Sequence, residues 1–319
     1  MLALLPAIYV GAKDTEIYVI PGGDSIGLQL STGIYITGKY NVKTEKGEVT
    51  PWRKGNLEVG DKIVSINNVE VSKIEDVQKI LSSFKEEQEL VLEIKRGTQI
   101  LRTSCRTVKD KGGKFTLGLY VKDEVMGVGT ITYIDPNTKN FGALGHSMIN
   151  EQIIGDSIGN LTASSIRGIR KSFPGIPGEK QATLSKRTVG TISKNIEIGV
   201  FGKVKDLKDF TEEKAIKVAS PDEVRLGKAQ MLTVLESNKK ESFEVEVVEV
   251  KNQSRKDVKG IKIKITDEAL LEKTGGIIQG MSGSPIIQDN KLIGAVSHVI
   301  IDSPDFGYCV YAMWMVNSF

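Results

Sequence analysis

One serine in this sequence has the surroundings that covalent acyl transfer requires. Ser282 lies in the stretch Gly280-Met281-Ser282-Gly283-Ser284-Pro285, where glycines on both sides allow a sharp turn around an exposed side chain. Attack on a carbonyl needs such a hydroxyl, with backbone N–H groups directed at the developing negative charge. The turn predicts Ser282 as a nucleophile, with the N–H groups of Gly280 and Ser282 as the oxyanion hole. The alternative interpretation is a bulged turn before a core strand.

Histidine is scarce, since His146 and His298 are the only two in 319 residues. His146 ends the stretch FGALGH, after a strand-like run, and loops at strand ends commonly build active sites. We predict that His146 takes the proton of Ser282 while a carboxylate holds the imidazole in the required tautomer. The alternative is a structural histidine, which is the commoner role of an isolated imidazole.

The elements that must position these two residues are mostly short strands. The stretch 128–146 predicts a strand, an Asp-Pro-Asn turn and a second strand. Strict alternation predicts strands over 242–250 and 260–266, and the last apolar stretch, 308–319, suits either a strand or a helix. Many strands with few convincing helices predict an all-β barrel or sandwich over residues 115–319.

The earlier part of the chain combines strands with one helix. Apolar spacing predicts a helix from Ile74 to Phe84, with Ser72 as N-cap and Glu75 completing a capping box. Lysines around two glycines in 109–114 predict a flexible linker. We therefore expect an N-terminal segment over 1–21, a first domain over 22–108 and a second domain over 115–319.

The first domain resembles a PDZ domain. LEVGDKIVSINNVEV, residues 57–71, is similar to the central Gly-Asp signature of that family, and SIGLQL, residues 25–30, is similar to its carboxylate-binding loop. The resemblance implies that the N–H groups of Ile26, Gly27 and Leu28 surround a peptide carboxylate while the peptide pairs with the adjacent strand. The alternative is an ordinary sheet edge.

The second domain resembles chymotrypsin-like serine peptidases. Gly-Met-Ser-Gly-Ser-Pro stands where that clan has Gly-Asp-Ser-Gly-Gly-Pro, and IIQDNKLIGAVSH is similar to the strand–turn–strand that follows. The resemblance implies a mainly β fold, a chymotrypsin-like double β-barrel after an α+β PDZ domain. It also places Ser297 and His298 on the strand that lines the substrate channel, with His298 in a supporting role. His146 precedes Ser282, as in the clan.

The chain as a whole resembles the stage IV sporulation protein B peptidase family. The resemblance is carried by the PDZ-like part and by the stretches FGALGHSM, GMSGSP and GAVSHV. The family's catalytic aspartate falls on Asp267, which departs from the usual pattern of an acid close in sequence to the histidine. Asp156, ten residues after His146, is the reserve. A competing interpretation makes Thr266 or Asp267 the N-cap of a helix that ends at Gly275.

The resemblance implies a serine endopeptidase of sporulation signalling that cleaves itself near its N-terminus and is gated or targeted by its PDZ domain. It implies export from the forespore into the intermembrane space and cleavage of a membrane-bound regulator of an intramembrane protease complex. Membrane association would come through an N-terminal segment, of which the apolar run 2–10 is either a remnant or merely an edge strand. The alternative hypothesis is a PDZ scaffold with an inactive peptidase-like domain. A third hypothesis, a cytosolic hydrolase of small molecules that forms an acyl-serine, has less support because the sequence contains no small-molecule signature.

Composition argues against several other classes of function. The 43 basic and 40 acidic residues nearly balance, which argues against a nucleic-acid footprint. Cys105 and Cys309 lie too far apart in sequence for a CxxC motif and are expected to be free, buried thiols, with a single long-range disulfide as the alternative. With two distant histidines and two distant cysteines, we expect neither a metal site nor a cofactor.

Overall fold

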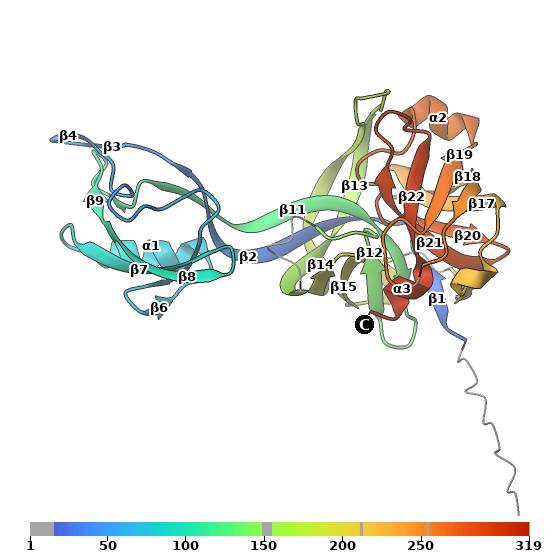
Figure 1. Ribbon diagram of the computed structural model, residues 1–319, viewed down its shortest axis with the longest axis horizontal. Helices are drawn as coiled ribbons and strands as arrows, with labels where there is room; N and C mark the ends of the chain where they lie inside the picture. The colour runs from blue at the N-terminus through green and yellow to red at the C-terminus, as the bar shows by residue number, and fades with distance from the viewer. Residues whose placement is uncertain (1–15, 149–154, 211–212, 254, 319) are drawn as a thin grey trace, which may run out of the picture.

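The computed structural model describes residues 16–148, 155–210, 213–253 and 255–318. Two lobes of unequal size are joined by two long strands, β2 (Ser25–Lys39) and β11 (Leu119–Ile134), which run side by side from one lobe into the other (Figure 1). They pair antiparallel from Lys39 opposite Leu119 to Ser25 opposite Thr130. The chain therefore leaves the larger lobe along β2, builds the smaller lobe and returns along β11.

The larger lobe contains two closed barrels. The first is a ring in which β2 pairs with β11, then β12, β15, β14 and β13 follow in turn, and β13 pairs back to β2. The additional strands of this barrel are β12 (Asn140–Ala143), β13 (Gly155–Arg170), β14 (Glu179–Ile196) and β15 (Gly199–Val204). Its core holds alternate residues of β2, namely Ile26, Leu28 and Leu30, because successive side chains of a strand point to opposite faces.

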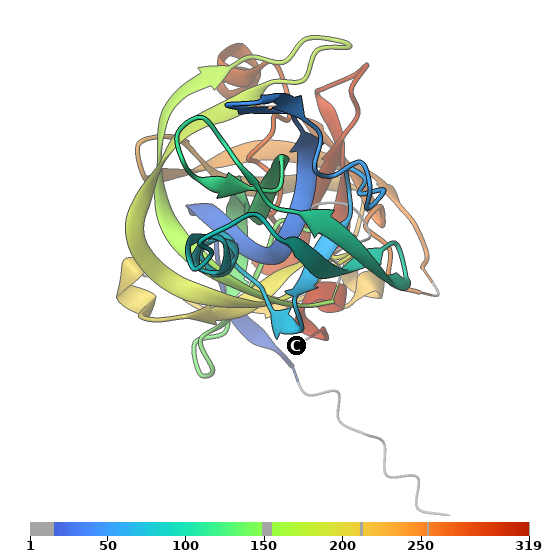
Figure 2. The ribbon, with the colours of Figure 1, turned by 90° about the vertical axis from the view of Figure 1, so that its left-hand side faces the viewer.

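The second barrel closes in the same way, in the order β17, β18, β19, β22, β21 and β20. Its strands are β17 (Gly227–Glu236), β18 (Lys239–Val250), β19 (Ile261–Ile265), β20 (Pro285–Gln288), β21 (Lys291–Val299) and β22 (Phe306–Tyr311). The alternation in GIKIKIT places Ile261, Ile263 and Ile265 in the core while the intervening lysines face outward. The predicted double β-barrel is the architecture observed. It is viewed from the smaller lobe's side in Figure 2.

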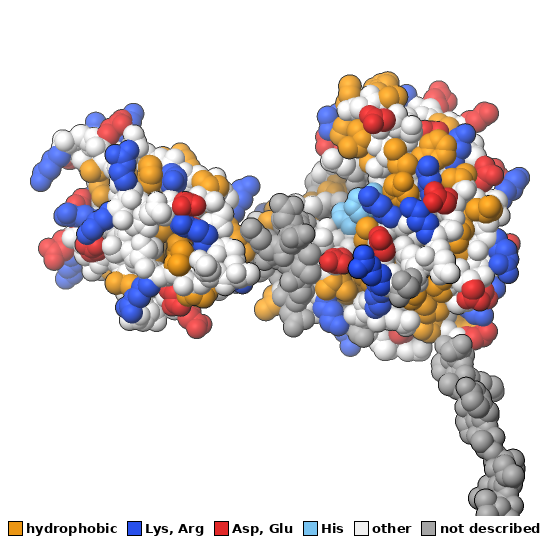
Figure 3. Space-filling model, viewed as in Figure 1, with side chains coloured by type: hydrophobic (Ala, Val, Ile, Leu, Met, Phe, Trp, Pro, Cys, Tyr) orange, Lys and Arg blue, Asp and Glu red, His pale blue; other side chains and the backbone are white. Residues whose placement is uncertain are grey.

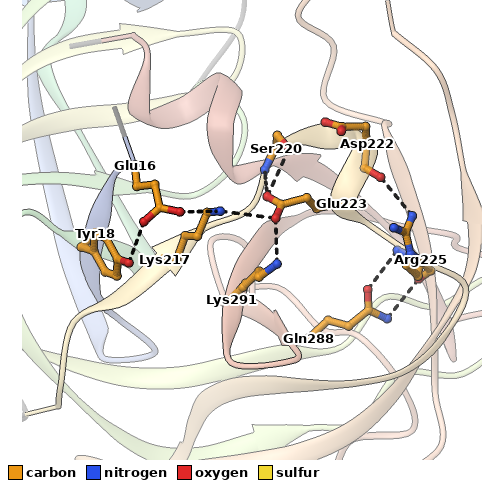
Figure 4. A network of polar contacts seen from close by, with 9 residues as sticks. All are labelled: Glu16, Tyr18, Lys217, Ser220, Asp222, Glu223, Arg225, Gln288 and Lys291. Carbon is orange, nitrogen blue, oxygen red and sulfur yellow. Dashed lines mark hydrogen bonds and ion pairs between the residues drawn. The ribbon is translucent and has the colours of Figure 1, made fainter. Parts of the chain in front are cut away.

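A short strand and a charged network connect the two barrels. Strand β16 (Ile216–Val218) pairs with β21 and with β1 (Tyr18–Pro21), and β1 also pairs with β11. Glu223, in the 3₁₀ turn Pro221–Glu223, accepts from Lys291 Nζ at 2.7 Å and Ser220 N at 2.9 Å (Figure 4). The Lys291 contact is the main reason that the pKa of Glu223 falls to about 2. Lys217 continues the network to Glu16 at 3.1 Å, which fixes the start of β1.

The smaller lobe packs one helix against short strands. Its elements are β3 (Val42–Thr44), β4 (Gly47–Val49), β5 (Lys62–Ile66), β6 (Val69–Glu70), α1 (Ile74–Ser82), β7 (Glu89–Arg96), β8 (Gln99–Arg106), β9 (Val108–Lys109) and β10 (Phe115–Thr116). Asp61 of the Gly-Asp signature is buried, and it accepts two hydrogen bonds of 2.7 Å from Arg96. This ion pair, of which the Asp61 carboxylate is buried and the Arg96 side chain partly exposed, ties the turn before β5 to the end of β7.

The structure corrects the domain boundaries drawn from the sequence. Residues 109–114 are no linker, because Lys109 ends β9 and residues 110–114 form the turn of the hairpin in which β9 pairs with β10. The core of the smaller lobe runs from Ile34 to Leu117, with Val121 of β11 packed against it. Residues 25–30, assigned to the first domain, belong instead to the first barrel. The smaller lobe is thus an insertion between two strands of the peptidase-like part.

The structure also tests the predicted helix, the C-terminal stretch and the two cysteines. Helix α1 starts at Ile74 as expected but ends at Ser82, two residues before the predicted end. Its N-cap is Lys73 rather than Ser72, and its capping box is closed by Asp76 rather than Glu75, since the Asp76 carboxylate accepts from the N–H groups of Ser72 and Lys73. The last apolar stretch is both predicted forms in succession, strand β22 and then helix α3 (Ala312–Val316). Cys105 and Cys309 are free and buried, as expected. Within the described part of the chain, no helix is long and apolar enough to cross a membrane.

Candidate active site

The histidine is placed by a left-handed turn at the end of β12. Leu144 and Gly145 have φ values of +68° and +66°, which bend the chain away from the barrel wall directly before His146. A Cβ atom at Gly145 would lie 2.9 Å from the Val296 carbonyl oxygen of the second barrel. The turn therefore needs glycine here, and it brings His146 to the junction of the two barrels.

The serine is placed by a second turn, on the opposite side of that junction. Gly280 and Gly283 have φ values of +92° and +91°, in the region that glycine reaches most easily. A Cβ atom at Gly283 would lie 2.1 Å from the Thr130 carbonyl oxygen and 2.4 Å from Leu144 N. The predicted turn around Ser282 is present, and its second glycine allows the close approach of the histidine loop.

Buried hydroxyl groups of β11 hold the nucleophile turn. Thr130 Oγ1 donates to the Gly280 carbonyl and Thr132 Oγ1 to the Gly283 carbonyl, both at 2.8 Å. Thr130 N also donates to the Ser282 carbonyl at 3.0 Å. Both threonine side chains are fully buried. The first barrel thus fixes the turn that the second barrel supplies.

His146 and Ser282 meet. Ser282 Oγ lies 2.9 Å from His146 Nε2, while His146 Nδ1 lies 2.7 Å from the Ser147 carbonyl oxygen. Because a carbonyl oxygen can only accept, Nδ1 carries the proton and Nε2 is left to accept the Ser282 O–H. Burial lowers the pKa of His146, and the hydrogen bond to Ser147 opposes this only in part. The imidazole is therefore neutral at pH 7 and suited to act as a base.

The structure does not bring the expected acid to the imidazole. Asp267 is the N-cap of α2 (Glu268–Thr274): one carboxylate oxygen accepts from Leu270 N at 2.9 Å and the other from Glu244 N at 3.3 Å. The helix ends at Gly275, with φ +71°, as the competing interpretation expected. The backbone of Asp156 lies in β13 opposite Lys194, and its side chain lies outside the described residues. The position taken by an acid in a triad is held here by the Ser147 carbonyl.

His298 and Ser297 lie on β21 beside the pair. The His298 ring is 5.4 Å from the His146 ring, centroid to centroid, and burial followed by the neighbouring His146 lowers the pKa of His298 to about 4. Ser297 is buried, with its hydroxyl 3.0 Å from the Tyr308 carbonyl. Histidine side chains reach the surface of the larger lobe on the side turned toward the smaller lobe (Figure 3).

A buried lysine under the nucleophile turn was missed from the sequence. Lys180 is only 5% exposed, and its Nζ donates to Thr233 Oγ1 at 2.7 Å, while Ser284 Oγ lies 3.1 Å from the same hydroxyl. Two of its side-chain carbons lie 3.1 Å from the position that a Cβ atom on Gly280 would take. Burial lowers the pKa of Lys180 to about 7. One lysine among many in the sequence carries no signal of this position.

Comparisons with known families agree with this geometry. A model of the SpoIVB peptidase S55 family matches residues 113–316, and a PDZ domain model matches residues 52–96. The chain belongs to the SpoIVB peptidase S55 family. It is a serine peptidase with a PDZ domain, which confirms the resemblance, the mainly β fold and the hydrolase class expected from the sequence.

Comparisons with solved structures and with curated proteins do not add to the family assignment. A solved structure titled "Crystal structure of Rv3671c protease, inactive form" is similar at 15% sequence identity and a TM-score of 0.35, covering 60% of this chain and 81% of that one. No curated protein matches the sequence.

The structure corrects the predicted PDZ loop. Ile26 and Leu28 lie in the core of the first peptidase barrel, and Gly27 is paired with Val128 on one side and with Thr162 on the other. With a strand on each edge of β2, these N–H groups have no open edge at which to receive a peptide carboxylate. SIGLQL is a barrel strand whose glycine and apolar residues happen to match the pattern of the carboxylate-binding loop.

Proposed function

We propose that this S55 peptidase is an endopeptidase in which Ser282 is the nucleophile and His146 the general base. The observation that carries the proposal is the 2.9 Å contact between Ser282 Oγ and His146 Nε2, with the Nδ1 side of the ring already engaged. Nucleophile and base are within hydrogen-bond reach in the resting chain, so the pair needs no rearrangement to begin catalysis.

The chemistry follows from that contact. Ser282 Oγ attacks the scissile carbonyl carbon while its proton passes to His146 Nε2, and the carbonyl electron pair moves onto the oxygen. Collapse of this intermediate breaks the C–N bond, and His146 gives the proton to the leaving amine. A water molecule then attacks the carbonyl carbon of the acyl-serine while its proton passes to His146 Nε2. Collapse of this second intermediate breaks the C–O bond to Ser282, whose Oγ takes the proton back, and releases the acid product.

The oxyanion hole and the substrate strand belong to the same proposal. Among the described residues, the N–H groups of Gly280 and Ser282 donate to no protein acceptor, which leaves them available for the developing oxyanion. Beyond Val296, strand β21 pairs with β22 on one edge, and no other strand of the described residues pairs with it there. A substrate strand would add to the open edge beside Ser297 and His298.

The PDZ domain would target or gate the peptidase, although not through Ile26–Leu28. Helix α1 lies beside the first part of β11: Ile74 N donates to Asp123 Oδ2 at 2.8 Å, and Leu119 and Val121 pack in the same core as the helix. From Leu119 to Gly127, β11 pairs only with β2 in the described chain. An extended peptide would therefore dock between α1 and the other edge of β11.

The biological part of the proposal is supported by family membership. We assign the chain to sporulation signalling, with cleavage of itself and of a membrane-bound regulator that controls late sigma-factor processing. Its place would be the intermembrane space, after export from the forespore, with membrane association through an N-terminal segment. The alternative, a scaffold without catalytic activity, makes the opposite prediction in the experiment that follows.

The test is covalent labelling of the purified chain by a fluorophosphonate, read by mass spectrometry. We expect one adduct on Ser282 in the wild type, none in Ser282→Ala, and an unchanged adduct in Ser242→Ala, which removes an exposed serine of β18. Self-cleavage and cleavage of a peptide library should disappear only in Ser282→Ala. An unlabelled wild type, or self-cleavage that survives in Ser282→Ala, contradicts the proposal.

A further inference from the structure

We propose that Asn195 is a positioning residue of the active site, which fixes His146 through the backbone of the two residues that follow it. The proposal rests on the role proposed for His146 as base. It explains how the imidazole is held in a site where the described structure brings no carboxylate to it.

The first step is the contact on the ring itself. His146 Nδ1 lies 2.7 Å from the carbonyl oxygen of Ser147, the next residue in the chain. The direction of the imidazole therefore depends on the orientation of one peptide group, between Ser147 and Met148. A peptide group in a loop can rotate unless its neighbours are fixed, and rotation would turn the carbonyl away from Nδ1.

Asn195 supplies that restraint. Its Nδ2 donates to the Met148 carbonyl at 2.8 Å, and its Oδ1 accepts from Met148 N at 2.7 Å. The Met148 N–H and the Ser147 carbonyl belong to the same peptide group, so the bond from Met148 N to Asn195 fixes the plane in which that carbonyl points. The second bond prevents Met148 from turning about the first.

The surroundings make these bonds effective. Asn195 is fully buried and Met148 is 8% exposed, so water competes little for either group. Asn195 comes from the end of β14, next to β15, which pairs with β12, the strand that precedes the His146 loop. A rigid barrel wall therefore holds the asparagine, whereas the histidine lies on a loop.

An asparagine suits this task better than an acid. The amide offers both a donor and an acceptor, which matches the N–H and C=O of one backbone residue. The titratable group that faces His146 from the second barrel is His298, on which Lys259 and Asp257 act in turn. Burial lowers the pKa of His146, and the neutral carbonyl at Nδ1 opposes this less than a carboxylate would, so the pKa stays below its usual value.

The chain offers a direct measurement, because it contains only two histidines. With ¹⁵N-labelled histidine, each ring has its own pair of nitrogen resonances, assigned by His298→Ala. In the wild type above the pKa of His146, we expect its Nδ1 to carry the proton. In Asn195→Ala, the ring should show a mixture of both tautomers. Asn160→Ala, which removes an exposed asparagine on β13, is the matched control and should keep the wild-type tautomer.

Kinetics provide the second readout. The fluorophosphonate labelling rate of Ser282 should fall about 10²-fold in Asn195→Ala, the size expected when a catalytic group is misplaced by about 1 Å. KM for a peptide substrate should stay within about twofold, since Asn195 is placed on the base rather than on substrate. Asn195→Leu, which keeps the side-chain volume, should lose as much and so separates the hydrogen bonds from packing.

The outcomes separate this inference from the function on which it rests. If the wild type fails to label, the proposed function fails. If the wild type labels, while folded Asn195→Ala and Asn195→Leu label within about threefold of it or keep a pure Nδ1-protonated ring, the positioning role is overturned. Folded fractions are checked by circular dichroism, and rates are compared per folded molecule.

Discussion

The two halves of this active site are built in different ways. The second barrel presents Ser282 on a turn that two positive-φ glycines shape and that two buried threonines of the first barrel hold. The first barrel presents His146 on a loop whose imidazole contacts the Ser147 carbonyl, while Asn195 holds that loop through Met148. Glycine backbone geometry thus shapes the serine turn, and hydroxyl groups of the other barrel hold it, whereas the ring of the histidine is oriented through a loop that an asparagine of its own barrel holds.

This difference shows which parts of a catalytic site a sequence pattern can carry. A glycine-rich turn is a local feature, so its consequence follows wherever the sequence occurs. The support of the histidine depends on a residue 49 positions away that carries no motif. The expected acid at Asp267 followed from the resemblance to the sporulation protein B family and departed from the usual clan pattern, and the structure uses this carboxylate to cap a helix.

The largest expected effect comes from removing the base. His146→Ala should lower kcat about 10⁴-fold or more, because Ser282 then has no acceptor for its proton, with KM nearly unchanged. His298→Ala removes the neighbouring imidazole and is the matched control, for which we expect a loss of about tenfold or less. A loss in His298→Ala as large as that in His146→Ala would exchange the roles of the two histidines.

The next effect tests how the first barrel supports the serine side. Thr130→Val keeps the shape of the side chain and removes the hydroxyl that donates to the Gly280 carbonyl. We expect the free energy of unfolding to fall by about 1–3 kcal/mol, because a buried acceptor loses its donor. We also expect kcat to fall about tenfold or more, since Gly280 belongs to the proposed oxyanion hole.

Thr191→Val, at an exposed position of β14, is the control for the Thr130 experiment. It should change neither quantity. A fully active Thr130→Val would mean that the glycine turn holds its shape without the hydroxyl, and the contrast between the two halves would then be sharper still.

The third effect is a pH dependence of stability caused by Lys180. Burial lowers its pKa to about 7 in the folded chain, against about 10.4 in the unfolded chain. Between these two values the unfolded chain binds the extra proton, so the free energy of unfolding should rise as pH increases from about 7 to about 10. Below pH 7 both states are charged, and this contribution becomes constant.

Lys180→Met should remove that rise, as measured by urea unfolding at a series of pH values. Lys228→Met, which changes an exposed lysine of β17, should retain it. Equal slopes for the wild type and Lys180→Met would place the buried ammonium in contact with water or with an acid.

The smallest expected effect distinguishes a cap from a catalyst. Asp267→Ala should lower the free energy of unfolding by about 1 kcal/mol through loss of the N-cap of α2. Activity per folded molecule should stay within about twofold, and Asp267→Ser, which can also cap the helix, should restore the stability. A fall in kcat of about 10³-fold or more in both variants would return Asp267 to the triad.

The sequence by itself determined strands of the second barrel, the turn around Ser282 and the ends of one helix. Alternation fixed which faces of β18 and β19 are buried, the spacing of Gly280 and Gly283 fixed a turn with Ser282 at its tip, and Asp267 with Gly275 marked the ends of a helix. Each of these depends on neighbours within a few residues, because φ angles, caps and strand periodicity are local properties.

Only the tertiary structure decided where long strands pair and which polar groups are buried. SIGLQL suits a peptide-binding loop or a barrel strand equally well, and pairing with both β11 and β13 selects the second. In the same way, nothing near Asn195 or Lys180 in sequence distinguishes them, because burial and hydrogen bonding arise from residues brought together by barrel closure. The pairing of distant strands and the burial of these two polar side chains are properties of the whole fold, so no local pattern could have supplied them.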